Sequence, residues 1–86
     1  AEKIRVLIVD DVAESRDNVE RLLSFEPDIQ IIGTASRGQE AIDASFERNP
    51  DIILMDVNMP DMDGVVATRA ILSQRPNVGV IMMSVM

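Results

Sequence analysis

Short runs of apolar residues alternate with longer amphipathic segments along the whole chain. The apolar runs are rich in β-branched residues, which is typical of strands that are covered on both faces. The longer segments repeat apolar residues at helical spacing. Strands that alternate with helices form a parallel sheet, with right-handed crossovers and with helices on both faces. The sequence therefore predicts an α/β fold built on a doubly wound parallel sheet.

The expected elements follow one another in the order β-α-β-α-β-α-β. We expect strands over residues 4–9, 29–35, 51–55 and 78–86, and helices over about 13–25, 37–48 and 65–74. Pro27 ends the first helix and Asn49-Pro50 ends the second, because proline cannot continue a helix. Ser36 and Gln39 have the spacing of a capping box, which predicts the start of the second helix.

Composition excludes several classes of chemistry. The chain has no cysteine and no histidine, which excludes disulfides, thiolate nucleophiles, histidine-based triads and the commonest zinc sites. Its 86 residues carry 8 lysines and arginines against 15 aspartates and glutamates, a net charge of −7. We therefore expect no direct binding of nucleic acid and no binding to an anionic membrane surface.

We also expect neither a membrane span nor a secretory signal. No apolar run approaches the length of about 18 residues that a membrane span needs. The first residues, Ala1-Glu2-Lys3-Ile4, lack the basic and then apolar layout of a signal peptide. A cytoplasmic location is therefore the expectation.

Three carboxylates are expected at the carboxyl ends of the strands. Asp10 and Asp11 follow the first strand, and Asp56 follows the third. Doubly wound sheets bind ligands beyond the carboxyl ends of their strands, where the strand order reverses. Each aspartate alone has a simpler interpretation, because Asp10 or Asp11 could cap a helix and Asp56 could open a turn. The convergence of all three favours a shared binding site.

Oxygen ligands without histidine or cysteine favour Mg²⁺, for which Mn²⁺ or Ca²⁺ could substitute. Such a cation would offset the mutual repulsion of the three carboxylates. With a cation present, Asp56 could act as a nucleophile toward phosphorus while Asp10 and Asp11 hold the metal. A main-chain carbonyl near Asn58 is a further candidate ligand. The Ser84 hydroxyl could bond either a phosphoryl oxygen or its own backbone.

Three stretches of the sequence resemble the receiver domain of two-component response regulators, the chemotaxis-type receiver. They are residues 6–11 (VLIVDD), 51–64 (DIILMDVNMPDMDG) and 80–84 (VIMMS). The resemblance covers all 86 residues and implies a flavodoxin-like sheet with the strand order 2-1-3-4. It also implies phosphorelay signalling, with a sensor histidine kinase or phosphotransfer protein as the phosphoryl donor.

The resemblance implies a role for each candidate residue. Asp56 is expected to be the phosphoacceptor, with Asp10 and Asp11 as its partners in binding Mg²⁺. Asn58 is expected to lend its main-chain oxygen to the metal, and Ser84 to be the switch hydroxyl that moves toward the phosphoryl group. The family is not one of turnover enzymes; at most, such a domain catalyses its own phosphorylation and dephosphorylation.

The resemblance also implies roles for Met86, Pro60 and Gly64, and a second role for Asn58. Asn58 and Met86 lie where side chains tune hydrolysis of the acyl phosphate. Pro60 and Gly64 match the loop that shapes the site, and we expect Gly64 to adopt a backbone conformation that is barred to other residues.

The resemblance also predicts that elements are missing. A complete receiver adds a fourth helix, a fifth strand and a fifth helix, and its fifth strand carries a lysine that pairs with the phosphoryl group. The only lysine here is Lys3, expected at the opposite end of the sheet from the acidic residues. The uncharged run 78–86 would then be an open edge strand. We expect that residues 1–86 are a receiver domain that is incomplete at its carboxyl end. The alternative is that a partner protein covers this edge.

Two functions stay open. The first is a phosphoacceptor module that switches a signalling output, with any output domain in the missing part. The second is a truncated or degenerate receiver that binds partners without phosphorylation. Homodimerisation stays open with either function.

Overall fold

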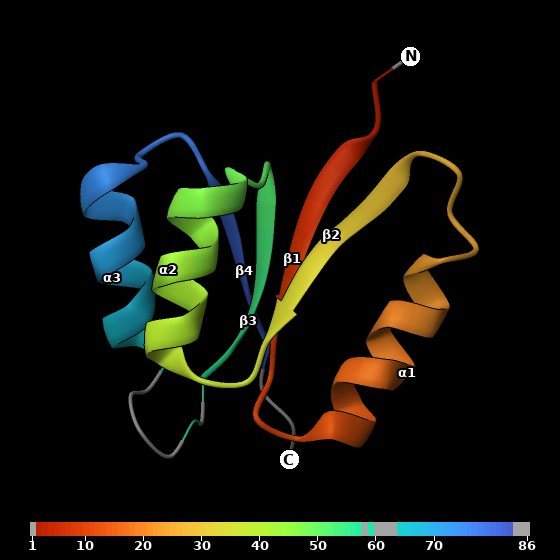
Figure 1. Ribbon diagram of the computed structural model, residues 1–86, viewed down its shortest axis with the longest axis horizontal. Helices are drawn as coiled ribbons and strands as arrows, with labels where there is room; N and C mark the ends of the chain where they lie inside the picture. The colour runs from red at the N-terminus through yellow and green to blue at the C-terminus, as the bar shows by residue number, and fades with distance from the viewer. Residues whose placement is uncertain (1, 58, 60–63, 84–86) are drawn as a thin grey trace.

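The computed structural model describes residues 2–57, 59 and 64–83, which form a four-stranded parallel sheet with helices on both faces. In chain order the elements are β1 (Ile4–Val9), α1 (Ala13–Leu23), β2 (Ile29–Ala35), α2 (Gly38–Arg48), β3 (Ile52–Asp56), α3 (Gly64–Gln74) and β4 (Gly79–Met83). The strand order is β2-β1-β3-β4, and every pair is parallel. Figure 1 shows α1 on one side of the sheet and α2 with α3 on the other. The predicted doubly wound sheet and its order 2-1-3-4 are confirmed.

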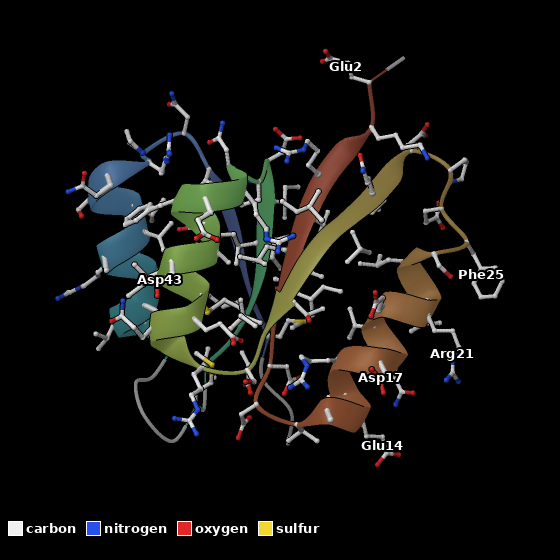
Figure 2. All side chains as sticks on the ribbon, viewed as in Figure 1. Glu2, Glu14, Asp17, Arg21, Phe25 and Asp43 are labelled. Carbon is white, nitrogen blue, oxygen red and sulfur yellow. The ribbon has the colours of Figure 1, made fainter. Side chains whose placement is uncertain are left out.

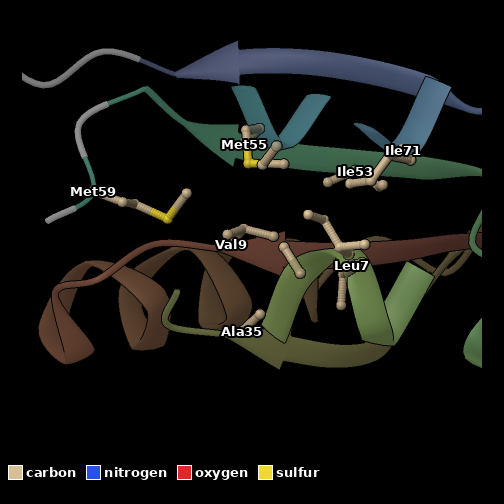
Figure 3. Close-up of a cluster of buried hydrophobic side chains, with 10 residues drawn as sticks. Leu7, Val9, Ala35, Ile53, Met55, Met59 and Ile71 are labelled. Carbon is tan, nitrogen blue, oxygen red and sulfur yellow. The ribbon is translucent and has the colours of Figure 1, made fainter. Parts of the chain in front are cut away.

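The hydrophobic core lies between the sheet and the helix pair α2–α3 (Figure 3). The two central strands contribute side chains that are fully buried, and the helices contribute small and branched residues. The core members are Leu7, Val9, Ala35, Ala41, Ile42, Ile53, Met55, Met59, Ala67 and Ile71. Burial of each large aliphatic side chain contributes about 1.5–3 kcal/mol. The central strands are therefore held firmly, and so are the residues at their carboxyl ends.

The other face of the sheet is covered less completely. Helix α1 packs against β1 and β2, yet none of its residues is buried. Phe25, just after this helix, is 77% exposed and points away from the sheet (Figure 2). The helix ends at Leu23, two residues earlier than expected from the sequence. In the described part of the chain, no helix has the length and apolar character to cross a membrane.

The ends of α2 show where local sequence signals succeed and fail. The capping box predicted from Ser36 and Gln39 is wrong, because Arg37 is the N-cap and makes no side-chain capping bond. Instead the Glu40 Oε1 atom accepts a bond of 2.6 Å from the main-chain N–H of Ser36. At the other end Asn49 closes the helix in the left-handed conformation, with φ of 52°. The predicted end at this residue is confirmed.

The third strand lies one residue later than its prediction, over Ile52–Asp56. Asp56 is opposite Met83 in the pairing of β3 with β4, which extends the ladder to the aspartate. Asp56 is therefore part of the sheet rather than of the following loop. The last strand is described over Gly79–Met83, and the remainder of its predicted range lies outside the described residues.

Candidate functional site

Asp10 directly follows β1 and is fixed at three of its groups. Its main-chain N–H donates to the Ala35 carbonyl at 3.0 Å, which continues the pairing with β2. Its Oδ1 atom accepts the Val12 main-chain N–H at 2.9 Å. Its main-chain carbonyl accepts a bond of 2.8 Å from the Arg16 Nη1 atom. Only 4% of Asp10 is exposed, so the protein holds this carboxylate in one direction.

Asp56 lies beside Asp10 because of the strand register. In the pairing of β1 with β3, Val9 is opposite Met55, so the next residue of each strand is an aspartate. Asp56 is 7% exposed. Two aspartates are therefore buried side by side at the carboxyl ends of the central strands, although aspartate is mostly an exposed residue.

One carboxylate oxygen from each of Asp10, Asp11 and Asp56 lies within 4.8 Å of those from the other two. Asp10 and Asp56 are buried, whereas Asp11 is exposed, so the cluster is open to solvent on the side of Asp11. At that separation each pair of charged carboxylates repels by about 3 kcal/mol for an effective dielectric constant of 20. A divalent cation bound between the carboxylates would attract all three and offset their mutual repulsion. An all-oxygen set of ligands fits Mg²⁺, Mn²⁺ or Ca²⁺.

The local alternatives for these aspartates account for only part of the geometry. The N-cap of α1 is Val12, and it makes no side-chain capping bond, so neither Asp10 nor Asp11 caps the helix. Asp10 does close a short turn onto the Val12 N–H. That turn uses one oxygen of one aspartate and does not account for the approach of all three carboxylates.

Gly64 brings α3 against the end of β3. Its N–H donates to the Val57 carbonyl at 3.1 Å. A Cβ atom at this position would lie 2.3 Å from the Asp56 carbonyl oxygen, far inside contact distance. The expectation that Gly64 needs a special backbone conformation is wrong, because no described glycine has a positive φ. The glycine is needed for space instead.

Several predicted site residues lie outside the described residues. These are Asn58, Pro60, Ser84 and Met86, and the roles expected for them stay predictions. Lys3 is exposed and precedes β1, whereas Asp10 and Asp11 follow it. Lys3 is therefore at the opposite end of this strand from the acidic cluster, as expected.

Arg16 is a site residue that the sequence did not single out. It is half-buried in the first turn of α1 and bonds the main chain of Asp10. A basic residue in the early part of the helix that follows an acidic pair was the available signal. That signal is weak, because most arginines on helices face solvent.

The fold and the site together define a doubly wound α/β domain with an acidic cluster at the carboxyl ends of its central strands. The response regulator receiver domain family matches residues 6–86. This chain belongs to that family, which serves signalling.

Curated relatives and solved structures agree with this assignment. The chain is 47% identical over 74 residues to protein-glutamate methylesterase/protein-glutamine glutaminase 2 of Carboxydothermus hydrogenoformans, covering 86% of the chain and 21% of that protein. It is 39% identical over 83 residues to the transcriptional regulatory protein DegU of Brevibacillus brevis, covering 96% of the chain and 35% of that protein. The chain thus spans between a fifth and about a third of these relatives.

Among solved structures, the response regulator domain of Thermotoga maritima CheB matches with a TM-score of 0.92 and 38% identity, covering 96% of this chain and 61% of that one. The CheX-CheY-BeF3-Mg+2 complex from Borrelia burgdorferi matches with a TM-score of 0.91 and 33% identity, covering 99% and 64% respectively.

Proposed function

We propose that this receiver accepts a phosphoryl group on Asp56 in a Mg²⁺-dependent reaction and thereby switches a signalling output. The observation that carries the proposal is the approach of three carboxylates to within 4.8 Å, with Asp56 buried at the end of a central strand. The similar complex from Borrelia burgdorferi, named for its BeF3 and Mg+2, supports the same kind of site. The expected donor is a sensor histidine kinase or a phosphotransfer protein.

In the proposed reaction a carboxylate oxygen of Asp56 attacks the phosphorus of the donor. A new phosphorus–oxygen bond forms while the bond from phosphorus to the donor atom breaks, and the donor atom keeps that electron pair. Asp10, Asp11 and Asp56 would hold Mg²⁺, with the main-chain oxygen of Asn58 as a further ligand. When bound, this ion neutralises charge on the carboxylates and the phosphoryl oxygens.

The protein contributes position more than chemistry. The Val9–Met55 register places Asp56 next to Asp10 before any ligand arrives. Ser84 is the proposed switch hydroxyl that bonds a phosphoryl oxygen. Attack of water on the acyl phosphate would restore Asp56, so the domain would at most process its own phosphoryl group. It would not turn over an external substrate.

We also propose that residues 1–86 form one receiver domain that is incomplete at its carboxyl end. The support is that the chain spans 61% of the CheB receiver structure. An output domain beyond this sequence, a cytoplasmic location and homodimerisation stay predictions.

Intact-mass measurement tests the phosphoacceptor directly. The chain is mixed with Mg²⁺ and acetyl phosphate, and we expect the mass to rise by one phosphoryl group. Asp56→Asn is expected to abolish the gain, because its amide is a poor nucleophile. Asp17→Asn is the matched control, since Asp17 is an exposed aspartate of α1 (Figure 2), and it should be phosphorylated like the wild type.

Two outcomes would contradict the proposal. A mass gain that persists in Asp56→Asn would show that another group accepts the phosphoryl. No gain in the wild type, with Mg²⁺ binding intact, would favour the alternative of a phosphorylation-independent interaction module.

A further inference from the structure

Arg16 connects α1 to the acidic cluster. Its Nη1 atom donates to the main-chain carbonyl of Asp10 at 2.8 Å in a partly buried position. Arg16 belongs to the first hydrogen-bonded turn of the helix, because its own N–H donates to the Val12 carbonyl at 3.0 Å. The guanidinium is therefore held between a rigid helix and the end of a buried strand.

The carbonyl that Arg16 binds belongs to the peptide that joins Asp10 to Asp11. The remaining groups of Asp10 are fixed without Arg16, through Ala35 and Val12. Asp11 is different, because it is exposed and its direction depends on the plane of this peptide. If the peptide rotated, the Asp11 side chain would turn away from the other two carboxylates.

We propose that Arg16 is a positioning residue for the Mg²⁺ site, which fixes the Asp10–Asp11 peptide and thereby directs Asp11 toward the ion. This inference rests on the proposed function, because it assumes that the three carboxylates bind Mg²⁺. Residues that orient metal ligands through hydrogen bonds typically change metal affinity by about 10- to 100-fold when they are replaced. Since Arg16 directs one ligand of the set, we expect a loss of about tenfold.

The charge of Arg16 and its positioning role predict opposite changes in Mg²⁺ affinity when Arg16 is replaced. A guanidinium beside an acidic cluster repels an incoming cation, so electrostatics alone predicts tighter Mg²⁺ binding after its removal. Positioning predicts weaker binding. Arg21 provides the matched control, because it lies on the same helix, is exposed and points away from the sheet (Figure 2).

Isothermal titration with Mg²⁺, without a phosphodonor, measures the affinities of the wild type and three variants. Arg16→Met keeps most of the aliphatic stem but loses the donor and the charge, and its affinity should fall about tenfold. Arg16→Lys keeps a donor and the charge and should retain more affinity than Arg16→Met. Arg21→Met loses a charge only, so its affinity should be unchanged or slightly higher.

Nuclear magnetic resonance of the wild type adds a readout that needs no variant to fold. In the absence of Mg²⁺, the Arg16 Nη–H protons should give separate, slowly exchanging signals, because one of them is bonded to the Asp10 carbonyl. Rapidly averaged Arg16 signals would overturn the inference.

The titrations distinguish this inference from the function on which it rests. A wild type that binds no Mg²⁺ would overturn the proposed function itself. A wild type that binds Mg²⁺ while Arg16→Met binds it equally or more tightly would overturn only the positioning role. Equal losses in Arg16→Lys and Arg16→Met would also count against that role.

Discussion

At the scale of single residues, the acidic cluster holds three carboxylates whose like charges repel one another. Asp10 and Asp56 are buried, and their carboxylate oxygens lie within 4.8 Å of each other and of Asp11. This repulsion opposes folding, and Asp11 is the exposed member of the cluster whose charge can be removed without changing the buried pair. The cluster is therefore better suited to binding a cation than to stabilising the fold.

We predict that Asp11→Asn raises the melting temperature of the chain by a few degrees in the absence of Mg²⁺, because it removes repulsion within the cluster. The same change should weaken Mg²⁺ binding. Circular dichroism during heating, with and without saturating Mg²⁺, measures both effects, since bound ligand stabilises the folded state. The stabilisation by Mg²⁺ should be smaller in the variant than in the wild type.

Asp17→Asn removes the same charge from an exposed position of α1 and serves as the control. Its melting temperature should respond to Mg²⁺ as the wild type does. A fall in the melting temperature of Asp11→Asn without Mg²⁺ would contradict the idea that repulsion in the cluster opposes folding.

At the scale of elements, the site depends on how closely α3 approaches the end of β3. The approach is made at Gly64, where an added Cβ would meet the Asp56 carbonyl oxygen at 2.3 Å and the Val57 Cα atom at 2.9 Å. Both neighbours are backbone atoms of the strand end, so they cannot move aside as a flexible side chain would. The glycine thereby links helix packing to the position of Asp56.

We predict that Gly64→Ala destabilises the chain by about 1–3 kcal/mol, as overpacking against rigid neighbours does. Urea unfolding followed by circular dichroism measures the free energy of unfolding. Gly79→Ala is the control, because its Cβ would meet ordinary contacts at 3.5 Å or more, and it should change stability by less than about 0.5 kcal/mol. Equal effects of the two substitutions would show that the close approach of α3 is not required.

The sequence predicted the order of the elements well because that order depends on local patterns. β-Branched runs marked the strands, and Asn49-Pro50 marked the end of α2, where Asn49 adopts the left-handed conformation. The two errors at the ends of elements had different causes, a tertiary contact for β3 and a local side-chain bond for α2. Pairing with Met83 extends β3 to Asp56, and Glu40 rather than a capping box bonds the N–H of Ser36.

The irregularity of β2 could not be predicted from local patterns at all. The register with β1 shifts between Val6 and Leu7, which are opposite Ile31 and Gly33, so Ile32 is the additional residue. The Arg48 Nη1 atom donates to the Ile32 carbonyl at 2.7 Å. The Arg48 side chain also lies over Gly33, where an added Cβ atom would be 3.3 Å from its Cδ atom. An arginine from α2 thus satisfies a carbonyl at the bulge, through a contact that depends on the packing of the whole layer.

The same distinction applies to the candidate site. The approach of Asp10, Asp11 and Asp56 follows from topology, because parallel strands bring their carboxyl ends to one edge, and the observed distances agree. The role of Arg16 depends on the rotation of α1 about its axis, which the sequence pattern does not determine. The need for Gly64 depends on an interatomic distance rather than on a backbone angle.

At the scale of the whole molecule, the two faces of the sheet are covered unequally. Helices α2 and α3 cover the core side, whereas α1 packs against β1 and β2 on the other side. Val80 packs against the core cluster, so its neighbour Ile81 points to the opposite face. Ile81 is 52% exposed, and its partner Leu54 on β3 is half-buried.

Apolar side chains on this face lie beside an edge of the sheet. Strand β4 is last in the strand order, so one of its edges has no partner strand among the described residues. The strand itself, Gly79–Met83, carries no charge and no proline. An uncharged apolar edge strand favours pairing with other chains, and a charged residue on such a strand prevents it.

We predict that the 86-residue chain associates as its concentration rises and that Ile81→Lys reduces this association, because it puts a charge beside the open edge. Size-exclusion chromatography with light scattering, over a range of concentrations, gives the mass of the species present. Phe25→Lys is the control: it also replaces an exposed apolar residue with a cation, but Phe25 lies outside the sheet (Figure 2). If both substitutions reduced association equally, general hydrophobicity rather than the β4 edge would be its cause. If the wild type stayed monomeric at all concentrations, the exposed face of β4 would not be sufficient to drive self-association.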